Sequence, residues 1–189
     1  MDKTLTLTQI HDLANSNGYP FAALNSVIRV ESSGHGFSPL TGRIIIQFEP
    51  TWFKREFADW KNHSDGHTWV NNGVGNQTDE WKAFNDAFAI NANAAMEATS
   101  IGLMQVMGFH WKDLGFTSVG AMWDFAKESE ANQVALGIRF IKTIPKLDTA
   151  LKNKDWATFA YYYNGSGYAK FNYDSRLATE YQKSVNLAA

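Results

Sequence analysis

The stretch Val30-Glu31-Ser32-Ser33-Gly34-His35-Gly36-Phe37 places a carboxylate and two glycines at the end of a predicted helix. The helix is expected to start near Pro20, because the fixed φ of proline suits a first helical turn. It carries an apolar stripe that ends at Glu31: Leu24, Val27 and Ile28. Glycines favour a turn immediately afterwards. We therefore expect a carboxyl group at a junction between helix and loop.

This position would raise the pKa of the Glu31 carboxyl group. Partial desolvation and the negative end of the helix dipole both disfavour the ionised form. A carboxylic acid that stays protonated near neutral pH is what a glycosidase needs to protonate a leaving sugar oxygen. The alternative is a glutamate that reaches solvent at a helix end, and spacing alone favours this simpler interpretation.

The composition is typical of a single globular domain, which we expect to span residues 1–189. Hydrophobic residues make up 44% of the chain and charged residues 19%, with a net charge of −2. Aromatic residues reach 14%. Exposed aromatic rings are common in carbohydrate-binding clefts, so the excess weakly favours a sugar ligand.

Several classes of function are excluded by what the sequence lacks. There is no Cys, which excludes thiol catalysis and thiolate metal sites. The five His are dispersed, and His63 and His67, four residues apart, could form a ligand pair, but a solvated loop is the favoured interpretation of that polar stretch. We therefore expect no metal and no cofactor. The sequence has no basic stripe of the kind that binds nucleic acid, so binding to nucleic acid is not expected. We also find neither a signal peptide nor an apolar run of about 20 residues, and therefore expect no membrane insertion.

The pattern predicts an α+β protein that is predominantly α-helical. The convincing strand covers residues 43–49, which are rich in β-branched side chains and lie between Gly42 and Pro50. One face of this strand is apolar: Ile44, Ile46 and Phe48. Glu49 lies on the opposite, more polar face, at the last residue of the strand.

Helices are predicted on both sides of this strand. Thr6 and Gln9 form a capping box for a helix that ends near Gly18. A long helix is expected from Glu80 through Ala95, preceded by an irregular loop or weak hairpin at 61–79. Further helices are expected at 110–114, 119–127, 130–143, 146–152, from Asp155 to Asn164, and from Asp174 onwards.

Three segments place polar groups beside apolar ones at a predicted turn: Glu31-Ser32, Met104-Gln105 and Tyr163-Asn164. Taken singly, they suggest an acid at a helix end, a core Met beside a surface Gln, and a routine Asn-Gly helix end. In this order, however, Glu-Ser, Gly-Leu-Met-Gln and Tyr-Tyr-Asn-Gly resemble the lysozyme-like superfamily. That superfamily includes goose-type lysozymes and lytic transglycosylases.

In detail the chain looks most similar to the N-acetylmuramidase family found in bacteriophage endolysins. The matching stretches are Val30–Phe37, Phe48-Glu49, Ser100–Gly108, Trp156-Ala157 and Tyr163–Gly165. The resemblance implies a lysozyme-like fold with a small β element beside the catalytic cleft. It also implies hydrolysis of peptidoglycan glycan strands between N-acetylmuramic acid and N-acetylglucosamine.

The resemblance assigns roles to individual residues. Glu31 matches the general acid, and Glu49 is the candidate second carboxylate, either as a base for water or as a stabiliser of the oxocarbenium-like centre. Gln105 and Asn164 would hydrogen-bond the N-acetyl and hydroxyl groups of the substrate. Two tyrosines would line the cleft: Tyr163, and as a looser candidate Tyr168.

The role of Glu49 has alternatives. Its carboxylate could form a salt bridge with Arg43 or cap the helix that starts at Pro50. Its competitors as second carboxylate are Glu97, Asp59 and Asp65, and the sequence does not rank them well.

Two other functions stay open. Lytic transglycosylases usually have Ala-Tyr-Asn-Ala-Gly where this chain has Tyr162-Tyr163-Asn164-Gly165-Ser166. They need one catalytic acid, because a hydroxyl of the substrate attacks in place of water. The third alternative is a non-catalytic glycan-binding or virion module, although the retained Glu31, Gln105 and Asn164 argue against it.

The resemblance also implies partners and location. The substrate would be bacterial peptidoglycan, and the chain is expected to be a monomer. Without a signal peptide it would wait in the host cytoplasm until a holin-type partner opens the membrane, and then act on the cell wall in the periplasm.

Overall fold

The computed structural model describes residues 2–32, 35–71 and 74–187. Helices dominate, and three short strands form one antiparallel sheet in the order β1-β2-β3. The strands are β1 (Ile46–Phe48), β2 (Thr99–Ile101) and β3 (Val106–Met107). The prediction of a predominantly α-helical α+β fold is confirmed.

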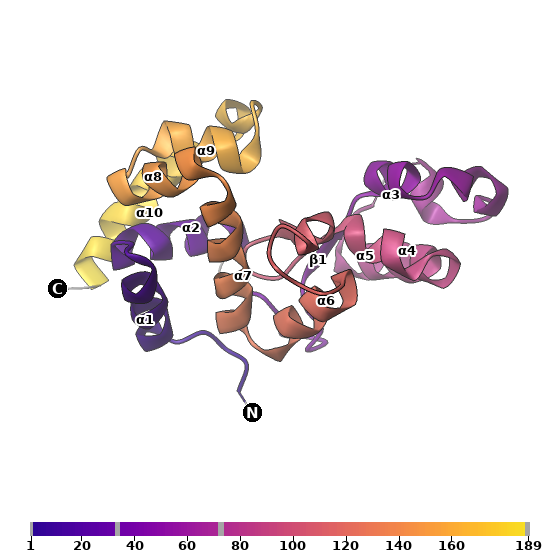
Figure 1. Cartoon of the computed structure of the whole chain (residues 1–189), viewed down its shortest axis with the longest axis horizontal. Helices are drawn as coiled ribbons and strands as arrows, with labels where there is room; N and C mark the ends of the chain where they lie inside the picture. The colour runs from indigo at the N-terminus through magenta and orange to yellow at the C-terminus, as the bar shows by residue number, and fades with distance from the viewer. Residues whose placement is uncertain (1, 33–34, 72–73, 188–189) are drawn as a thin grey trace.

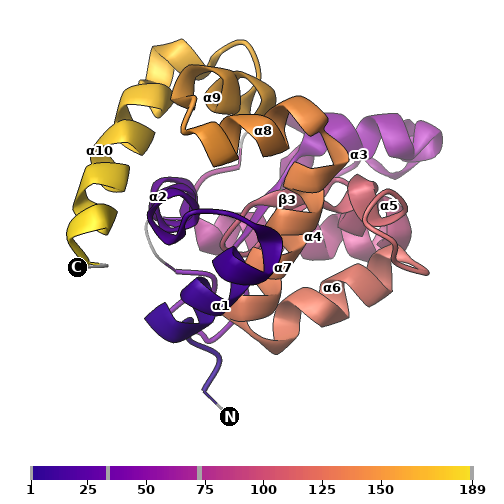
Figure 2. The ribbon, with the colours of Figure 1, turned by 60° about the vertical axis from the view of Figure 1, so that its left-hand side comes forward.

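One group of helices surrounds α2, the helix that carries Glu31. Its members are α1 (Leu7–Asn17), α2 (Phe21–Ser32), α7 (Glu130–Thr143), α8 (Pro145–Asn153), α9 (Trp156–Asn164) and α10 (Tyr173–Leu187). Helix α2 packs mainly against α10 and also contacts α1 and α8. Its predicted stripe is buried, with Leu24 and Val27 completely covered. Figures 1 and 2 show this group at the end of the molecule that holds both termini.

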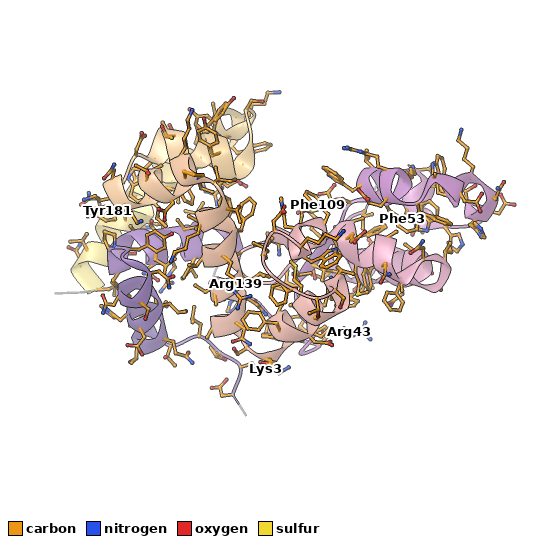
Figure 3. The ribbon with its side chains drawn as sticks, in the orientation of Figure 1. Lys3, Arg43, Phe53, Phe109, Arg139 and Tyr181 are labelled. Atoms are coloured by element: carbon orange, nitrogen blue, oxygen red, sulfur yellow. The ribbon has the colours of Figure 1, made fainter. Side chains whose placement is uncertain are left out.

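A second group of helices lies at the opposite end in Figure 1. It contains α3 (Pro50–Glu56), α4 (Gln77–Ile90), α5 (Ala92–Glu97) and the 3-10 turns η1 (Ala58–His63) and η2 (Thr68–Asn71). Its core is aromatic, because Trp69 is fully buried and meets Phe53 edge to face. Figure 3 labels Phe53 within this group.

The remaining elements connect the two groups. They are η3 (Gly108–Trp111) and α6 (Val119–Glu128), whereas η4 (Tyr168–Phe171) packs on α9 and α10 within the first group. Helix α6 packs against α7 and α5, so the two ends of the molecule share a continuous core. No helix in the described ranges combines the length and hydropathy needed to cross a bilayer.

Strand β1 covers only residues 46–48 of the predicted strand 43–49, but the burial of this stretch alternates as predicted. Ile44, Ile46 and Phe48 are all buried, whereas Gln47 is exposed. The strand pairs with β2 in the register Gln47 to Ser100. Side chains of α4 form hydrogen bonds with the backbone groups along the other edge of β1, so these groups are not left unpaired.

The structure corrects several element boundaries. The predicted helix from Glu80 to Ala95 starts earlier, at Gln77, and breaks at Asn91, whose extended backbone and side chain cap the separate helix α5. Residues 61–79 form 3-10 turns and the start of α4 in their described part, and the helix predicted at 110–114 is the 3-10 turn η3. Strands β2 and β3 were not predicted, because segments this short carry too few residues for a period-two pattern.

Candidate active site

A cleft of about 320 Å³ opens where the end of α2 faces the sheet. The backbone of β1 forms part of its wall. Its polar lining side chains are Glu31, His35, Gln47, Gln77, Glu80 and Gln105. The structure thus brings together Glu31 and Gln105, which are far apart in the sequence.

Glu31 is poised to hold a proton near neutral pH. Burial raises the pKa of its carboxyl group from 4.5 to about 7, against the opposing effects of Asn164 and Arg176. The Asn164 amide donates to the Glu31 carboxylate at 3.4 Å, which is a long hydrogen bond. Arg176 is engaged elsewhere, since its guanidinium donates to the Val30 carbonyl at 3.1 Å. Desolvation therefore dominates, as the sequence predicted.

Tyr163 lies close enough to Glu31 to feel its charge, although neither Tyr163 nor Asn164 is among the residues that line the cleft. Its hydroxyl donates to the Met104 carbonyl at 2.7 Å, and its ring stacks on Phe159. Burial raises the pKa of the Tyr163 phenol well above its usual range, with a contribution from the charge of Glu31. The hydroxyl is thus fixed as a donor that ties α9 to the turn between β2 and β3.

Gln105 occupies a strained position in that turn. Its φ of 46° lies in the left-handed region, which a non-glycine residue seldom adopts. Its side-chain amide donates to the Gly102 carbonyl at 2.7 Å and its side-chain oxygen accepts from the Ser100 hydroxyl at 2.9 Å. One amide hydrogen is left for a ligand.

Two buried side chains of α7 hold the loops that form the cleft. The Glu130 carboxylate accepts from the Gly36 N–H at 2.7 Å, and the Gln133 side-chain oxygen accepts from the Leu103 N–H at 2.8 Å. Gln133 also lies against Gly36 and Gly102, where a Cβ would approach its side chain to within 1.9 Å and 2.5 Å. Small residues at both positions therefore let the two loops close onto α7.

Glu49 lies at the end of β1 with its side chain half-buried. Its carboxylate accepts from the side-chain amide of Gln47 at 2.7 Å, and burial raises the pKa of the group against that hydrogen bond. The carboxylate does not cap α3, and no ion pair links it to Arg43 among the described residues. Both structural alternatives for Glu49 are therefore absent from this arrangement.

The competing carboxylates are placed elsewhere. Glu97 accepts from the indole N–H of Trp111 at 2.7 Å. Asp59 is exposed and hydrogen-bonds Asn62, and Asp65 is also exposed. Tyr168 meets the ring of Tyr161 edge to face and does not line the Glu31 cleft.

Sequence reasoning missed four of the polar lining residues: His35, Gln47, Gln77 and Glu80. Gln77 and Glu80 share one face of the first turn of α4, where Gln77 bonds both backbone groups of Ile46, and Glu80 accepts from the Phe48 N–H at 2.6 Å. The sequence signal that could have predicted this face is Asn76, a residue type that caps helices. Asn76 caps α4 and so fixes where the helix starts and which side chains share a face of its first turn.

A further cleft carboxyl group is thus present on Glu80. Burial raises the pKa of Glu80, and the nearby charge of Glu49 adds to the effect. No cluster of three or more metal-ligating side chains occurs in the described part of the chain. The cleft is therefore lined by two carboxyl groups among the described residues, Glu31 and Glu80, whereas Glu49 lies outside its lining. Of these, Glu31 has the clearest character of an acid.

Comparison with known proteins agrees with this arrangement. The model of the N-acetylmuramidase family matches residues 20–185, which includes every lining residue of the cleft. The chain belongs to the N-acetylmuramidase family. Membership makes it a peptidoglycan hydrolase, and the predicted resemblance is confirmed.

A solved structure supports the same conclusion. The crystal structure of the Burkholderia AP3 phage endolysin is 35% identical in sequence and superposes with a TM-score of 0.88. The match covers 100% of this chain and 74% of the endolysin chain. A search of curated proteins found no match.

Proposed function

We propose that the protein is a phage endolysin that hydrolyses the glycosidic bond between N-acetylmuramic acid and N-acetylglucosamine. The supporting observation is Glu31, a carboxyl group with a pKa of about 7 in a cleft lined by amides and carboxylates. A carboxylic acid with this pKa is matched to protonating a leaving oxygen near neutral pH.

In the proposed reaction the Glu31 carboxyl group gives its proton to the glycosidic oxygen as the bond to the anomeric carbon breaks. Glu31 is left as a carboxylate, and positive charge develops on the sugar ring. Glu49 is the proposed second carboxylate, because it follows β1 two residues after the cleft-lining Gln47, whose side-chain amide donates to it and partly offsets the rise in pKa that burial causes. In the ionised form it would accept a proton from water or stabilise the positive sugar centre.

The remaining predicted site residues take two kinds of role. Gln105 would present its free amide hydrogen to the substrate, and Tyr163 would form the wall next to Glu31. Asn164 already donates to Glu31, so we propose that it orients the acid while its second amide hydrogen is left for the sugar. Tyr168 would contact only glycan that extends beyond the cleft.

The cellular setting is part of the same proposal. The protein would act as a monomeric single domain, remain in the host cytoplasm until a holin-type partner opens the membrane, and then reach the periplasmic wall. No metal or cofactor is needed for acid-assisted hydrolysis by carboxyl groups.

Mass spectrometry of the soluble fragments released from purified peptidoglycan tests the reaction. Reducing N-acetylmuramic acid ends are expected. Anhydro-muramic acid ends would mean that the protein is a lytic transglycosylase, and the lack of any release would favour a glycan-binding module.

A further inference from the structure

A second, larger hollow lies next to the active-site cleft. It has a volume of about 720 Å³ and lies between the turn at residues 38–43 and the first half of α4. Gln77 lines both this hollow and the Glu31 cleft, so the two meet at that side chain. The hollow is therefore the neighbouring space for parts of a substrate that project from the cleft past Gln77.

Arg43 gives this hollow its charge. Figure 3 labels Arg43 near the lower edge of the molecule, away from the C-terminal helices. Its side chain is exposed, and no ion pair or side-chain hydrogen bond to another described residue engages its guanidinium. The other cation of the hollow, Lys82, is paired with Asp86 at 2.8 Å. Arg43 is thus the cation of the hollow whose charge no described carboxylate compensates.

The aromatic side chain of the hollow supports binding of an anion and does not offer a free platform for a sugar. The guanidinium of Arg43 lies over the Trp81 ring, 5.4 Å from its centre, and so occupies part of the space above that face. The indole N–H of Trp81 donates to the Ile44 carbonyl at 3.3 Å. A guanidinium with no carboxylate partner offers a planar fork of N–H donors, which matches the two oxygens of a carboxylate.

The hollow also has an apolar rim. Leu40 is 94% exposed, which is unusual for a large aliphatic side chain. A ligand that carries both carboxylates and short aliphatic groups would satisfy Leu40 and Arg43 together. Stem peptides of peptidoglycan have this chemistry, because they contain both alanine and carboxylate-bearing residues and branch from the muramic acid sugar.

We propose that this hollow binds the stem peptide of a muramic acid held next to Glu31, with Arg43 receiving a peptide carboxylate and Leu40 covering an alanine methyl group. This inference rests on the proposed function, since the cleft must first bind the glycan. Its consequence is a preference for peptide-bearing strands over strands without peptides.

The test compares two substrates and two arginine variants. Intact peptidoglycan fragments and the same fragments stripped of peptides by an amidase are cleaved by the wild type, by Arg43→Ala and by Arg55→Ala. Arg55 is a matched control because its guanidinium also stacks on a tryptophan, 4.1 Å from the centre of the Trp52 ring, outside the hollow.

Arg43→Ala is expected to lower kcat/KM on peptide-bearing fragments by about tenfold to a hundredfold, the usual effect of losing a hydrogen bond to a charged group. Its kcat/KM on stripped fragments should stay at the wild-type value, and Arg55→Ala should match the wild type on both substrates. Arg43→Lys should recover only part of the loss, because an ammonium lacks the planar fork.

Equal losses on both substrates, or no loss on either, would overturn the proposal. If the wild type cleaves neither substrate, the proposed function fails. Calorimetric binding of a soluble muramyl peptide then tests separately whether the hollow binds the stem peptide. Binding that is weakened by Arg43→Ala and unchanged by Arg55→Ala supports the site, whereas equal binding by all three proteins rejects it.

Discussion

The two walls of the cleft carry the same residue type in different surroundings. On the helical wall, Glu31 at the end of α2 accepts one long hydrogen bond, at 3.4 Å, from Asn164 of α9. On the sheet wall, formed by β1 and the start of α4, the lining residue Glu80 accepts a hydrogen bond at 2.6 Å, and Glu49, which follows β1 outside the lining, accepts one at 2.7 Å. Short hydrogen bonds favour a carboxylate, whereas burial without them favours the neutral acid. Burial raises the pKa of all three carboxyl groups, and the pKa of Glu31, with only a long hydrogen bond to oppose it, reaches about 7.

The strongest test of the helical wall is Glu31→Gln. Removing the acid should lower the rate of wall lysis by about 10²- to 10⁴-fold, the usual contribution of general acid catalysis. Folding should be retained, because an amide is no harder to bury than the carboxyl group it replaces. Lysis of permeabilised cells and thermal melting measure the two effects, with the exposed Glu56→Gln as control. Lysis at the wild-type rate would remove Glu31 from the mechanism.

The pKa of Glu31 also predicts a dependence of stability on pH. The folded protein keeps a proton up to about pH 7 that the unfolded chain releases near pH 4.5. This contribution is fully present below pH 4.5 and is lost as the pH rises through about 7. The cost should reach on the order of 3 kcal/mol once Glu31 is ionised.

Urea unfolding of the wild type and of Glu31→Gln across this pH range measures the effect. The variant should gain stability relative to the wild type as the pH rises, because it lacks the titrating group. Lytic activity should fall over the same upper range as the acid loses its proton. A constant difference in stability between the two proteins would contradict the raised pKa.

On the sheet wall, Glu49→Gln separates a catalytic carboxylate from a structural one. If Glu49 accepts a proton from water or stabilises the positive sugar centre, the rate of hydrolysis should fall by on the order of 10²-fold with little change in the free energy of unfolding. Glu80→Ala is the contrasting variant, since it leaves the Phe48 N–H without its acceptor and should cost about 1–3 kcal/mol of stability. An active Glu49→Gln protein would leave Glu80 as the remaining carboxylate on this wall.

The smallest expected effect is at α7, which supports both walls. Gln133→Ala removes the acceptor of the Leu103 N–H and should lower the free energy of unfolding by about 1–2 kcal/mol. Because the turn that carries Gln105 loses its support, KM should rise more than kcat falls. Chemical unfolding and steady-state kinetics measure these effects, with Gln182→Ala on the exposed face of α10 as control. Unchanged values of both would show that this contact does not hold the turn.

The two ends of the molecule differed in how well the sequence predicted them. Around α2 the local signals were sufficient, as the capping box at Thr6, the cap at Asp155 and helix α7 show. Around the sheet they were not, because the strands are two or three residues long and the 3-10 turns contain few apolar residues. Trp69 is fully buried there only because other aromatic rings enclose it.

The sequence by itself determined the helical framework and the position of an acid at the end of α2, because apolar periodicity and helix caps are local properties. It also indicated Gln105, Tyr163 and Asn164 through the order of short motifs. Only the tertiary structure decided that Glu80 and Gln77 face the same cleft as Glu31, and that Asn164 contacts the acid itself. The physical reason is that burial and hydrogen bonding, which set the pKa of a carboxyl group, depend on segments that meet only when the chain folds.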